Sequence, residues 1–485
     1  MNKKNLGLFL SSIFYGVGGA IPRVISFILL PVFTSYLTPL DYGVLGLLVA
    51  LPAILLPVFS VGLSASIGVC YFAVEDQACR RNIISTSRAV TYISSVVMLV
   101  ITVFALDWVT AVSVGSLEYR LHVLVAIATV VLNVLCLPLQ LEQQFSGRPK
   151  EYVAVSLAGV FFSSLCSLIL VVIFEVGSIG PLVGSLLGQA VSYSLLMYSG
   201  KERLVGGEVD WQIGMQLLKH GMPMLPSFVF LFVIQSGVRW PLEWRHGMEQ
   251  VGLYSLGTSL GSVMALFTTG VVTAWMPWVM AQSSAWKESR NLVARRFTQY
   301  FMVGSFLVLL FFCFAQPALH LLTSHEFYDA WRVVGLVAAS NFMVAVFSLV
   351  LPPVYMAKKV PLILISQGIS AAVAVACMYY FLVFGILGAA FSVFLASVVL
   401  VVVQLFVNFK LTNIEPIPLD FYRLGIFLAL LIFCCGATFF LDAENFFHFS
   451  VRALGLLSIS GCLLLAMIPG RAVLLERVRE LASRR

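Results

Sequence analysis

The longest uncharged segment of the chain is VPLILISQGISAAVAVACMYYFLVFGILGAAFSVFLASVVLVVVQLFVNF (Val360–Phe409), which holds 50 residues without an Asp, Glu, Lys or Arg. A helix needs about 20 predominantly apolar residues to cross the hydrocarbon layer of a membrane. The segment is too long for a single crossing, so it predicts two membrane-spanning helices.

The rest of the chain has the same character. Its 485 residues are 60% hydrophobic and 11% charged, with a mean hydropathy of +1.00, whereas about 25% of the residues of a soluble protein are charged. Further uncharged segments cover 42–74, 121–141, 152–174, 176–200, 250–286, 297–325 and 333–357. The composition therefore predicts a multi-pass membrane protein with no inserted soluble domain and no cleavable signal peptide.

These segments and their flanks predict an all-α polytopic membrane protein with fourteen transmembrane helices. The expected spans are 7–36, 43–70, 89–107, 120–141, 152–174, 178–199, 220–241, 250–280, 297–316, 331–355, 361–383, 386–408, 421–441 and 451–468. With the N-terminus inside, 23 of the 29 Lys and Arg residues fall in inner loops or tails. The positive-inside rule then predicts that both termini are cytoplasmic. The net charge of +7 reflects this bias, and we expect no nucleic-acid partner.

The chain resembles itself at an offset of 208 to 210 residues. Gly43 in DYGVLGLL aligns with Gly252 in QVGLYSLG, and Lys150 aligns with Lys358. Six helices in each half predict a parallel repeat of two six-helix bundles, related by an axis along the membrane normal. The expected domains are 1–200, 201–410, and 411–485 with helices 13 and 14. Transporters built in this way hold substrate between their bundles, so transport is the predicted function class.

Arg23 lies near mid-depth of the first predicted helix, in GGAIPRVISFILLPVF (Gly18–Phe33). A charged side chain at the bilayer centre costs about 2.5–3.5 kcal/mol on insertion scales, so it normally faces a cavity or a partner. No carboxylate lies within a turn or two of Arg23 in the sequence. We predict that Arg23 binds substrate; the alternative is that it hydrogen-bonds carbonyl groups of a helix broken at Pro22.

Arg239 is a second candidate for substrate binding, near the outer end of the seventh predicted helix. Its alternatives are extension to the outer interface and pairing with Glu243. All 22 acidic residues can be assigned to loops or helix ends, so the membrane interior offers cationic candidates and no anionic one. This predicts an anionic substrate, and the planar guanidinium of Arg suits phosphate.

Two prolines are candidates for hinges between moving bundles. Pro22 interrupts the first predicted helix, and Pro277 interrupts the eighth, in TAWMPWVMAQ (Thr273–Gln282). The neighbouring Trp275 and Trp278 are typical of anchors at the inner membrane interface. The sequence contains no nucleotide-binding, metal-binding or catalytic motif, so we predict no enzymatic activity, metal or cofactor.

Several segments resemble the polysaccharide flippases (Wzx-type) of the multidrug/oligosaccharidyl-lipid/polysaccharide exporter superfamily. The segment ISFILLPVFTSYLTPLDYGVLGLL (Ile25–Leu48) is similar to the first-helix signature of the family, and VGLYSLGTSLGSVMALFTTGVVTAWMPW (Val251–Trp278) to its eighth helix. The openings of the seventh and tenth helices are similar as well, in HGMPMLPSFVF (His220–Phe230) and EFYDAWRVVGLV (Glu326–Val337). The resemblance covers nearly the whole chain.

The resemblance implies transfer of an undecaprenyl-pyrophosphate-linked oligosaccharide across the bacterial inner membrane, as in O-antigen and other lipopolysaccharide or polysaccharide biosynthesis. The diphosphate is then the anion expected at Arg23. Family members often carry an acidic residue before the arginine that aligns with Arg239, where this chain has Val238. Because the second predicted helix contains no arginine, the chain departs from the lipid II flippase branch.

Partners and energy source follow from the same resemblance. We expect a monomer that contacts membrane lipids, with a polysaccharide polymerase and a chain-length regulator as partners, and coupling to an H⁺ or Na⁺ gradient or to the membrane potential. Two alternatives stay open. One is a cation-coupled multidrug exporter of the same superfamily, and the other is a membrane polysaccharide polymerase or glycosyltransferase.

Overall fold

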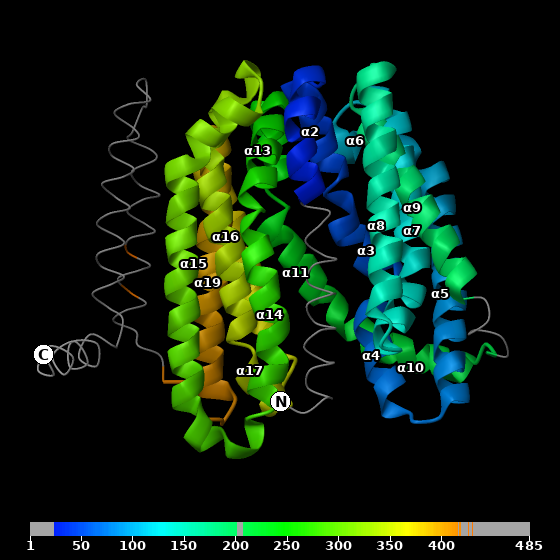
Figure 1. Cartoon of the computed structure of the whole chain (residues 1–485), viewed down its shortest axis with the longest axis vertical. Coiled ribbons are helices and arrows are strands. Elements are labelled where there is room, and N and C mark those ends of the chain that lie inside the picture. Colours follow the sequence, from blue (N-terminus) through cyan, green and yellow to red (C-terminus); the bar gives the residue numbers. More distant parts are fainter. Residues whose placement is uncertain (1–23, 201–206, 416, 419–424, 426–428, 430–485) are drawn as a thin grey trace, which may run out of the picture.

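The computed structural model describes residues 24–200, 207–415, 417, 418, 425 and 429 (Figure 1). In these residues, nine helical stretches are long and apolar enough to cross a membrane, or ten when the bent pair Met248–Gly261 and Met264–Met280 is taken as one span. The chain is therefore an all-α, multi-pass membrane protein. Predicted helices 13 and 14 and the start of the first helix lie outside the described residues, which leaves the count of fourteen a prediction.

The described helices form two groups (Figure 1). The helix Val24–Tyr36 precedes the first group, which contains α2 (Pro39–Leu48), α3 (Leu51–Phe59), α4 (Leu63–Ala73), α5 (Gln77–Phe104), α6 (Leu106–Val114), η1 (Leu117–Tyr119), α7 (Arg120–Phe145), α8 (Pro149–Leu168), η2 (Ile169–Ile173) and α9 (Ile179–Gly200). Two connecting helices follow, α10 (Trp211–Gly221) and η3 (Met222–Met224). The second group contains α11 (Leu225–Gln235), α12 (Arg239–His246), α13 (Met248–Gly261), α14 (Met264–Met280), η4 (Ser283–Ala285), α15 (Trp286–Leu322), η5 (His325–Ala330), α16 (Trp331–Leu349), α17 (Pro352–Met356), α18 (Leu362–Phe381), η6 (Leu382–Phe384) and α19 (Gly385–Leu411).

The uncharged segment 360–409 forms two helices, as predicted. α18 and α19 pack against each other, and the strongly positive φ of 61° at Gly385 turns the chain between them. A side chain is strained at such a φ, which is why glycine occupies this turn.

Several predicted helices are wrong in their continuity. The predicted helix 43–70 is divided into α2, α3 and α4, since Pro52 lies at the start of α3 and Gly62, with a φ of 71°, precedes α4. The predicted helix 250–280 bends by 50° between α13 and α14. The predicted helix 220–241 is also broken, between α11 and α12 at residues 236–238. Proline and left-handed glycine interrupt a helix without changing its hydropathy.

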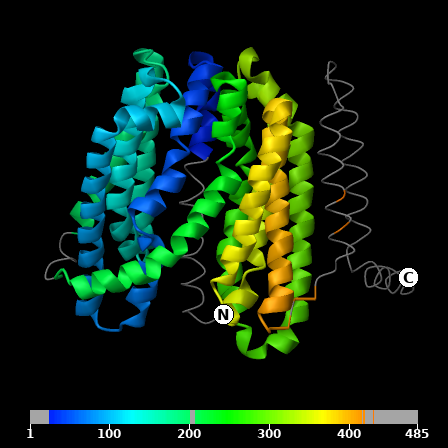
Figure 2. The same ribbon diagram turned by 180° about the vertical axis from the view of Figure 1, so that it is seen from behind.

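α10 joins the two groups from below. It runs across the lower ends of α4 and α5, and α11 slants back toward the second group (Figures 1 and 2). α10 lies close to the first group at Gly221, where an added Cβ would lie 2.7 Å from the carbonyl oxygen of Val61. The sequence does not predict this crossing, because most of α10 lies between the predicted spans 178–199 and 220–241.

At the opposite end, α2 and α13 lie side by side (Figures 1 and 2). A Cβ on Gly43 would overlap the carbonyl oxygen of Met248, and a Cβ on Gly252 would overlap that of Pro39. Gly252 lies 209 residues after Gly43, and Met248 lies 209 residues after Pro39. The two helices therefore meet through equivalent positions of the repeat, in a contact that we call the glycine seam.

The helix α2 is fixed to the first group at its start. Thr38 caps its N-terminus, and the Asp41 carboxylate accepts hydrogen bonds from the Thr38 backbone N–H (3.1 Å) and from that of Ser178, just before α9 (3.2 Å). Such caps satisfy N–H groups that have no partner within the helix. One half of the glycine seam is thus anchored to the first group of helices.

The two groups differ in how their interiors are packed. The second group has one continuous apolar core, with the buried aromatic side chains of Tyr254, Phe297, Phe342 and Phe394. The apolar residues of the first group form three smaller clusters. The interior of the first group consequently has room for a cavity.

Candidate functional site

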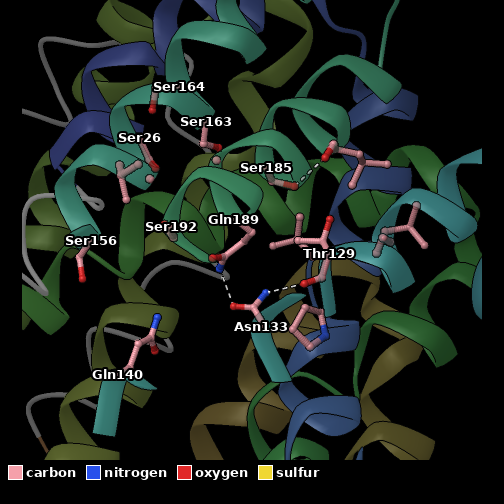
Figure 3. A pocket seen from close by; sticks show the side chains of 18 residues that line it. Ser26, Thr129, Asn133, Gln140, Ser156, Ser163, Ser164, Ser185, Gln189 and Ser192 are labelled. Atoms are coloured by element: carbon pink, nitrogen blue, oxygen red, sulfur yellow. Dashed lines mark hydrogen bonds between the residues drawn. The ribbon is translucent and has the colours of Figure 1, made fainter. Parts of the chain in front are cut away.

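A polar cavity lies inside the first group of helices, which we call the N-cavity (Figure 3). Its volume is about 420 Å³, and α7, α8 and α9 provide most of its lining. The polar side chains among its described lining residues are Ser26, Thr129, Asn133, Gln140, Ser156, Ser163, Ser164, Ser185, Gln189 and Ser192, and none of the described lining residues is ionisable. A hydrogen-bonding surface of this kind, within apolar helices, is unusual unless it faces water or a ligand.

Two amides fix one wall of the N-cavity. The Asn133 side chain on α7 donates to the carbonyl oxygen of Thr129, one turn earlier, at 3.0 Å. The Gln189 side chain on α9 donates to the Asn133 carbonyl oxygen (Figure 3). This pair uses one N–H of each amide and leaves the second N–H of each, together with the Gln189 carbonyl oxygen, available to a ligand.

A second cavity of about 400 Å³ lies between the two groups, and we call it the interface cavity. It is lined from the first group by Ser163, Ser164 and Ser167 and from the second by Ser259 and Ser262. The helix Val24–Tyr36 contributes residues such as Ser26 and Phe27.

The two cavities adjoin each other. Ser26, Ser163 and Ser164 line both. These three serines therefore lie at the boundary that the two cavities share.

Arg23 and Pro22, the predicted binding residue and hinge of the first helix, lie outside the described residues. The nearest described polar residue of that helix is Ser26, three residues after Arg23, and it lines both cavities. Substrate binding by Arg23 stays a prediction.

Arg239 begins α12 and lines neither the N-cavity nor the interface cavity. Its guanidinium carbon lies 5.6 Å from the centroid of the buried Tyr254 ring, a distance typical of a cation–π contact. Within the described part of the chain, no ion pair joins it to Glu243, whose carboxyl pKa is raised by burial. Its Nε atom is buried and has no hydrogen-bond partner among the residues that the structure describes. Substrate binding by Arg239 also stays a prediction.

Pro277 lies inside α14, which continues through it to Met280. The bend in this region is at residues 262–263, between α13 and α14, so a hinge at Pro277 is still a prediction. Trp275 is not an interfacial anchor. Its ring is 7% exposed, and its Nε1 donates to the carbonyl oxygen of Leu349 at 3.0 Å, at the end of α16.

A sequence model described as polysaccharide biosynthesis protein matches residues 10–283, more than half of the chain. The chain belongs to this family. No curated protein sequence matches the chain.

Solved structures share the fold at low sequence identity. The lipid II flippase MurJ in an inward closed conformation is 12% identical, with a TM-score of 0.69 over 95% of this chain and 100% of that chain. A multidrug resistance MATE family transporter of the MOP superfamily, in an inward-facing conformation, is 14% identical, with a TM-score of 0.65 over 81% of this chain and 98% of that chain. The outward-facing conformation of a multidrug resistance MATE family transporter is 15% identical, with a TM-score of 0.52 over 83% of this chain and 95% of that chain. The chain thus has the fold of MOP-superfamily transporters.

The N-cavity was not predicted, because charge marks the sites expected in membrane spans and none of its described lining residues is ionisable. A signal was nevertheless present. On α8, Ser163 follows Ser156 by seven residues and is adjacent to Ser164, and on α9 Ser185, Gln189 and Ser192 are four and three residues apart. This spacing places each set on one face of its helix.

Proposed function

We propose that the protein is a flippase that carries an undecaprenyl-pyrophosphate-linked oligosaccharide from the cytoplasmic to the periplasmic leaflet of the bacterial inner membrane. Membership of the polysaccharide biosynthesis protein family carries this proposal. The polar cavities within and between bundles of apolar helices support it, because a flippase must shelter a hydrophilic head group from lipid. The proposal includes no enzymatic step and no metal or cofactor.

Alternating access is the proposed mechanism. The diphosphate enters from the cytoplasmic side and meets Arg23, while the sugars occupy polar space and the polyprenyl tail stays in lipid. Rocking of the bundles opens the glycine seam and releases the head group outside. An anionic head group leaving a negative interior is favoured by about 2.3 kcal/mol per charge per 100 mV, so the membrane potential is a sufficient drive in principle.

The two alternatives differ from this proposal in their chemistry. A cation-coupled drug exporter requires an acidic group for its cargo or coupling ion, and none of the described residues that line the two cavities is acidic. A polymerase or glycosyltransferase requires a site that breaks and forms glycosidic bonds. The shared fold is that of transporters and flippases.

A deletion strain tests the proposed function. We expect loss of surface polysaccharide, accumulation of single lipid-linked repeat units on the cytoplasmic leaflet, and unchanged drug sensitivity. Thin-layer chromatography of radiolabelled lipid-linked sugars, with and without a membrane-impermeant glycosidase, measures their length and sidedness. Altered chain length without altered sidedness would indicate a polymerase instead, and drug sensitivity with normal polysaccharide would indicate an exporter.

A further inference from the structure

We propose that the N-cavity recognises the sugar part of the lipid-linked substrate, through neutral amides and hydroxyls on α7, α8 and α9. This inference rests on the proposed function and adds to it a place where the sugars bind. The diphosphate itself is expected at Arg23, which lies outside the described residues. Ser26, three residues later in the sequence, lines the N-cavity where it adjoins the interface cavity.

The strongest observation is unused hydrogen-bonding capacity. Within the described part of the chain, the Gln140 amide and the hydroxyls of Ser163, Ser164 and Ser192 line the N-cavity without a hydrogen-bond partner. Polar groups in a protein interior normally find partners, since an unmade hydrogen bond costs free energy. Groups left open around one space indicate a ligand or water that completes them.

A linked set of polar residues in the second group shows one structural use of such side chains in this chain. Ser366 donates to Gln404 at 2.6 Å, Gln404 donates to Asn408 at 3.0 Å, and Asn408 donates to the carbonyl oxygen of Val350 at 2.6 Å. These side chains link neighbouring helices to one another, the usual role of polar residues between membrane helices. The open amide and serines of the N-cavity do not follow this pattern.

The internal repeat allows the N-cavity serines to be compared with the equivalent positions of the second group. Gly177 and Gly385 align at an offset of 208 residues, and the same offset relates five N-cavity serines to apolar residues of the second group. Ser156, Ser163, Ser164, Ser185 and Ser192 correspond to Leu364, Ala371, Ala372, Val393 and Leu400. Ala371, Val393 and Leu400 belong to the continuous apolar core of that group. One bundle is therefore filled and the other is hollow and polar at matching positions.

Asn133 has an equivalent residue in the second half of the repeat. Asn341 lies 208 residues later, and its side chain donates to the carbonyl oxygen of Val337, one turn earlier, at 3.1 Å. The local hydrogen bond is the same as that of Asn133, but Asn341 lines neither cavity. This gives a control that removes the same bond outside the proposed site.

The chemistry of the lining suits sugars. Sugar hydroxyls both donate and accept hydrogen bonds, as amides and serine hydroxyls do. A volume of about 420 Å³ falls within the range of small-molecule sites, about 300–1,000 Å³. Directional neutral groups of this kind discriminate between ligands by the presence and position of a hydroxyl.

Binding to the purified full-length protein tests the inference with two probes. One is undecaprenyl pyrophosphate, and the other is the native lipid-linked oligosaccharide pool extracted from the source bacterium. We expect wild type to bind the pool more tightly. Gln140→Met, and the double variant Asn133→Leu/Gln189→Met, should each weaken binding of the pool about tenfold and leave binding of undecaprenyl pyrophosphate unchanged. Asn341→Leu should bind both probes as wild type does.

The outcomes separate this inference from the proposed function. A wild type that binds neither probe overturns both. A wild type that prefers the pool, with variants that keep the full preference, overturns the sugar site and leaves the flippase proposal standing. Gln140 has no protein partner in the described residues, so Gln140→Met tests the site even if the double variant does not fold.

Discussion

Replacement of Gly252 by leucine is expected to abolish transport while the protein remains in the membrane. A Cβ at this position would overlap the Pro39 carbonyl oxygen and lie 3.0 Å from the backbone nitrogen of Gly43. Both contacts are with backbone, so a side chain has to push α2 and α13 apart. Overpacking typically costs about 1–3 kcal/mol, and about 3 kcal/mol against the closed seam changes the equilibrium between two states roughly a hundredfold.

The size of the substituent and a matched glycine provide the controls. Gly252→Ala should lose less activity than Gly252→Leu. Gly270→Leu should retain normal transport, because no atom of the described residues lies within 4 Å of a Cβ added at Gly270. Surface polysaccharide and membrane protein levels are measured together in a complemented deletion strain. Normal polysaccharide from Gly252→Leu would show that the seam does not have to close.

The second large effect is expected from Arg23→Ala, which should eliminate surface polysaccharide at normal membrane levels. The reason is its predicted position near mid-depth of the first helix. No carboxylate lies near it in the sequence, so the substrate diphosphate is the anion expected to pair with its guanidinium. Arg23→Lys should restore only part of the activity, because lysine keeps the charge and loses the two-pronged contact with phosphate oxygens.

Arg120→Ala is the matched control for the loss of an arginine. Arg120 is half exposed and pairs with Asp107 at 2.7 Å at the start of α7, and exposed ion pairs contribute little. Export should therefore be normal in this variant. If Arg23→Ala also supports normal polysaccharide, the arginine has a structural role or none, and the diphosphate binds elsewhere.

In the described part of the chain, the approximate positions of the membrane helices were predictable, and their interruptions were not. Uncharged length identifies a span, as in the segment that forms α18 and α19, because the cost of burying charge in lipid dominates. The breaks depend on local backbone geometry, such as the left-handed Gly62 before α4. Apolar residues continue on both sides of such a break, so hydropathy gives no sign of it.

The candidate site was predictable in part. Aligning the two halves paired Gly43 with Gly252, but only packing showed that each of these glycines contacts the opposite helix. The neutral N-cavity was missed because serine and glutamine carry no charge penalty that marks them as unusual in a membrane helix. Gln404 has side-chain hydrogen-bond partners and Gln140 has none in the described residues, a difference that only the folded chain shows.

Reconstitution of the purified protein into liposomes tests the central claim most directly. The native lipid-linked oligosaccharide pool is introduced, and the fraction cleaved by an impermeant glycosidase outside the vesicles is followed over time. With wild type, we predict that the protected inner-leaflet fraction becomes cleavable, whereas vesicles with Gly252→Leu keep it protected. If wild-type vesicles protect the inner pool as well as protein-free vesicles do, under an imposed membrane potential and under H⁺ or Na⁺ gradients, the protein is not a flippase for this substrate.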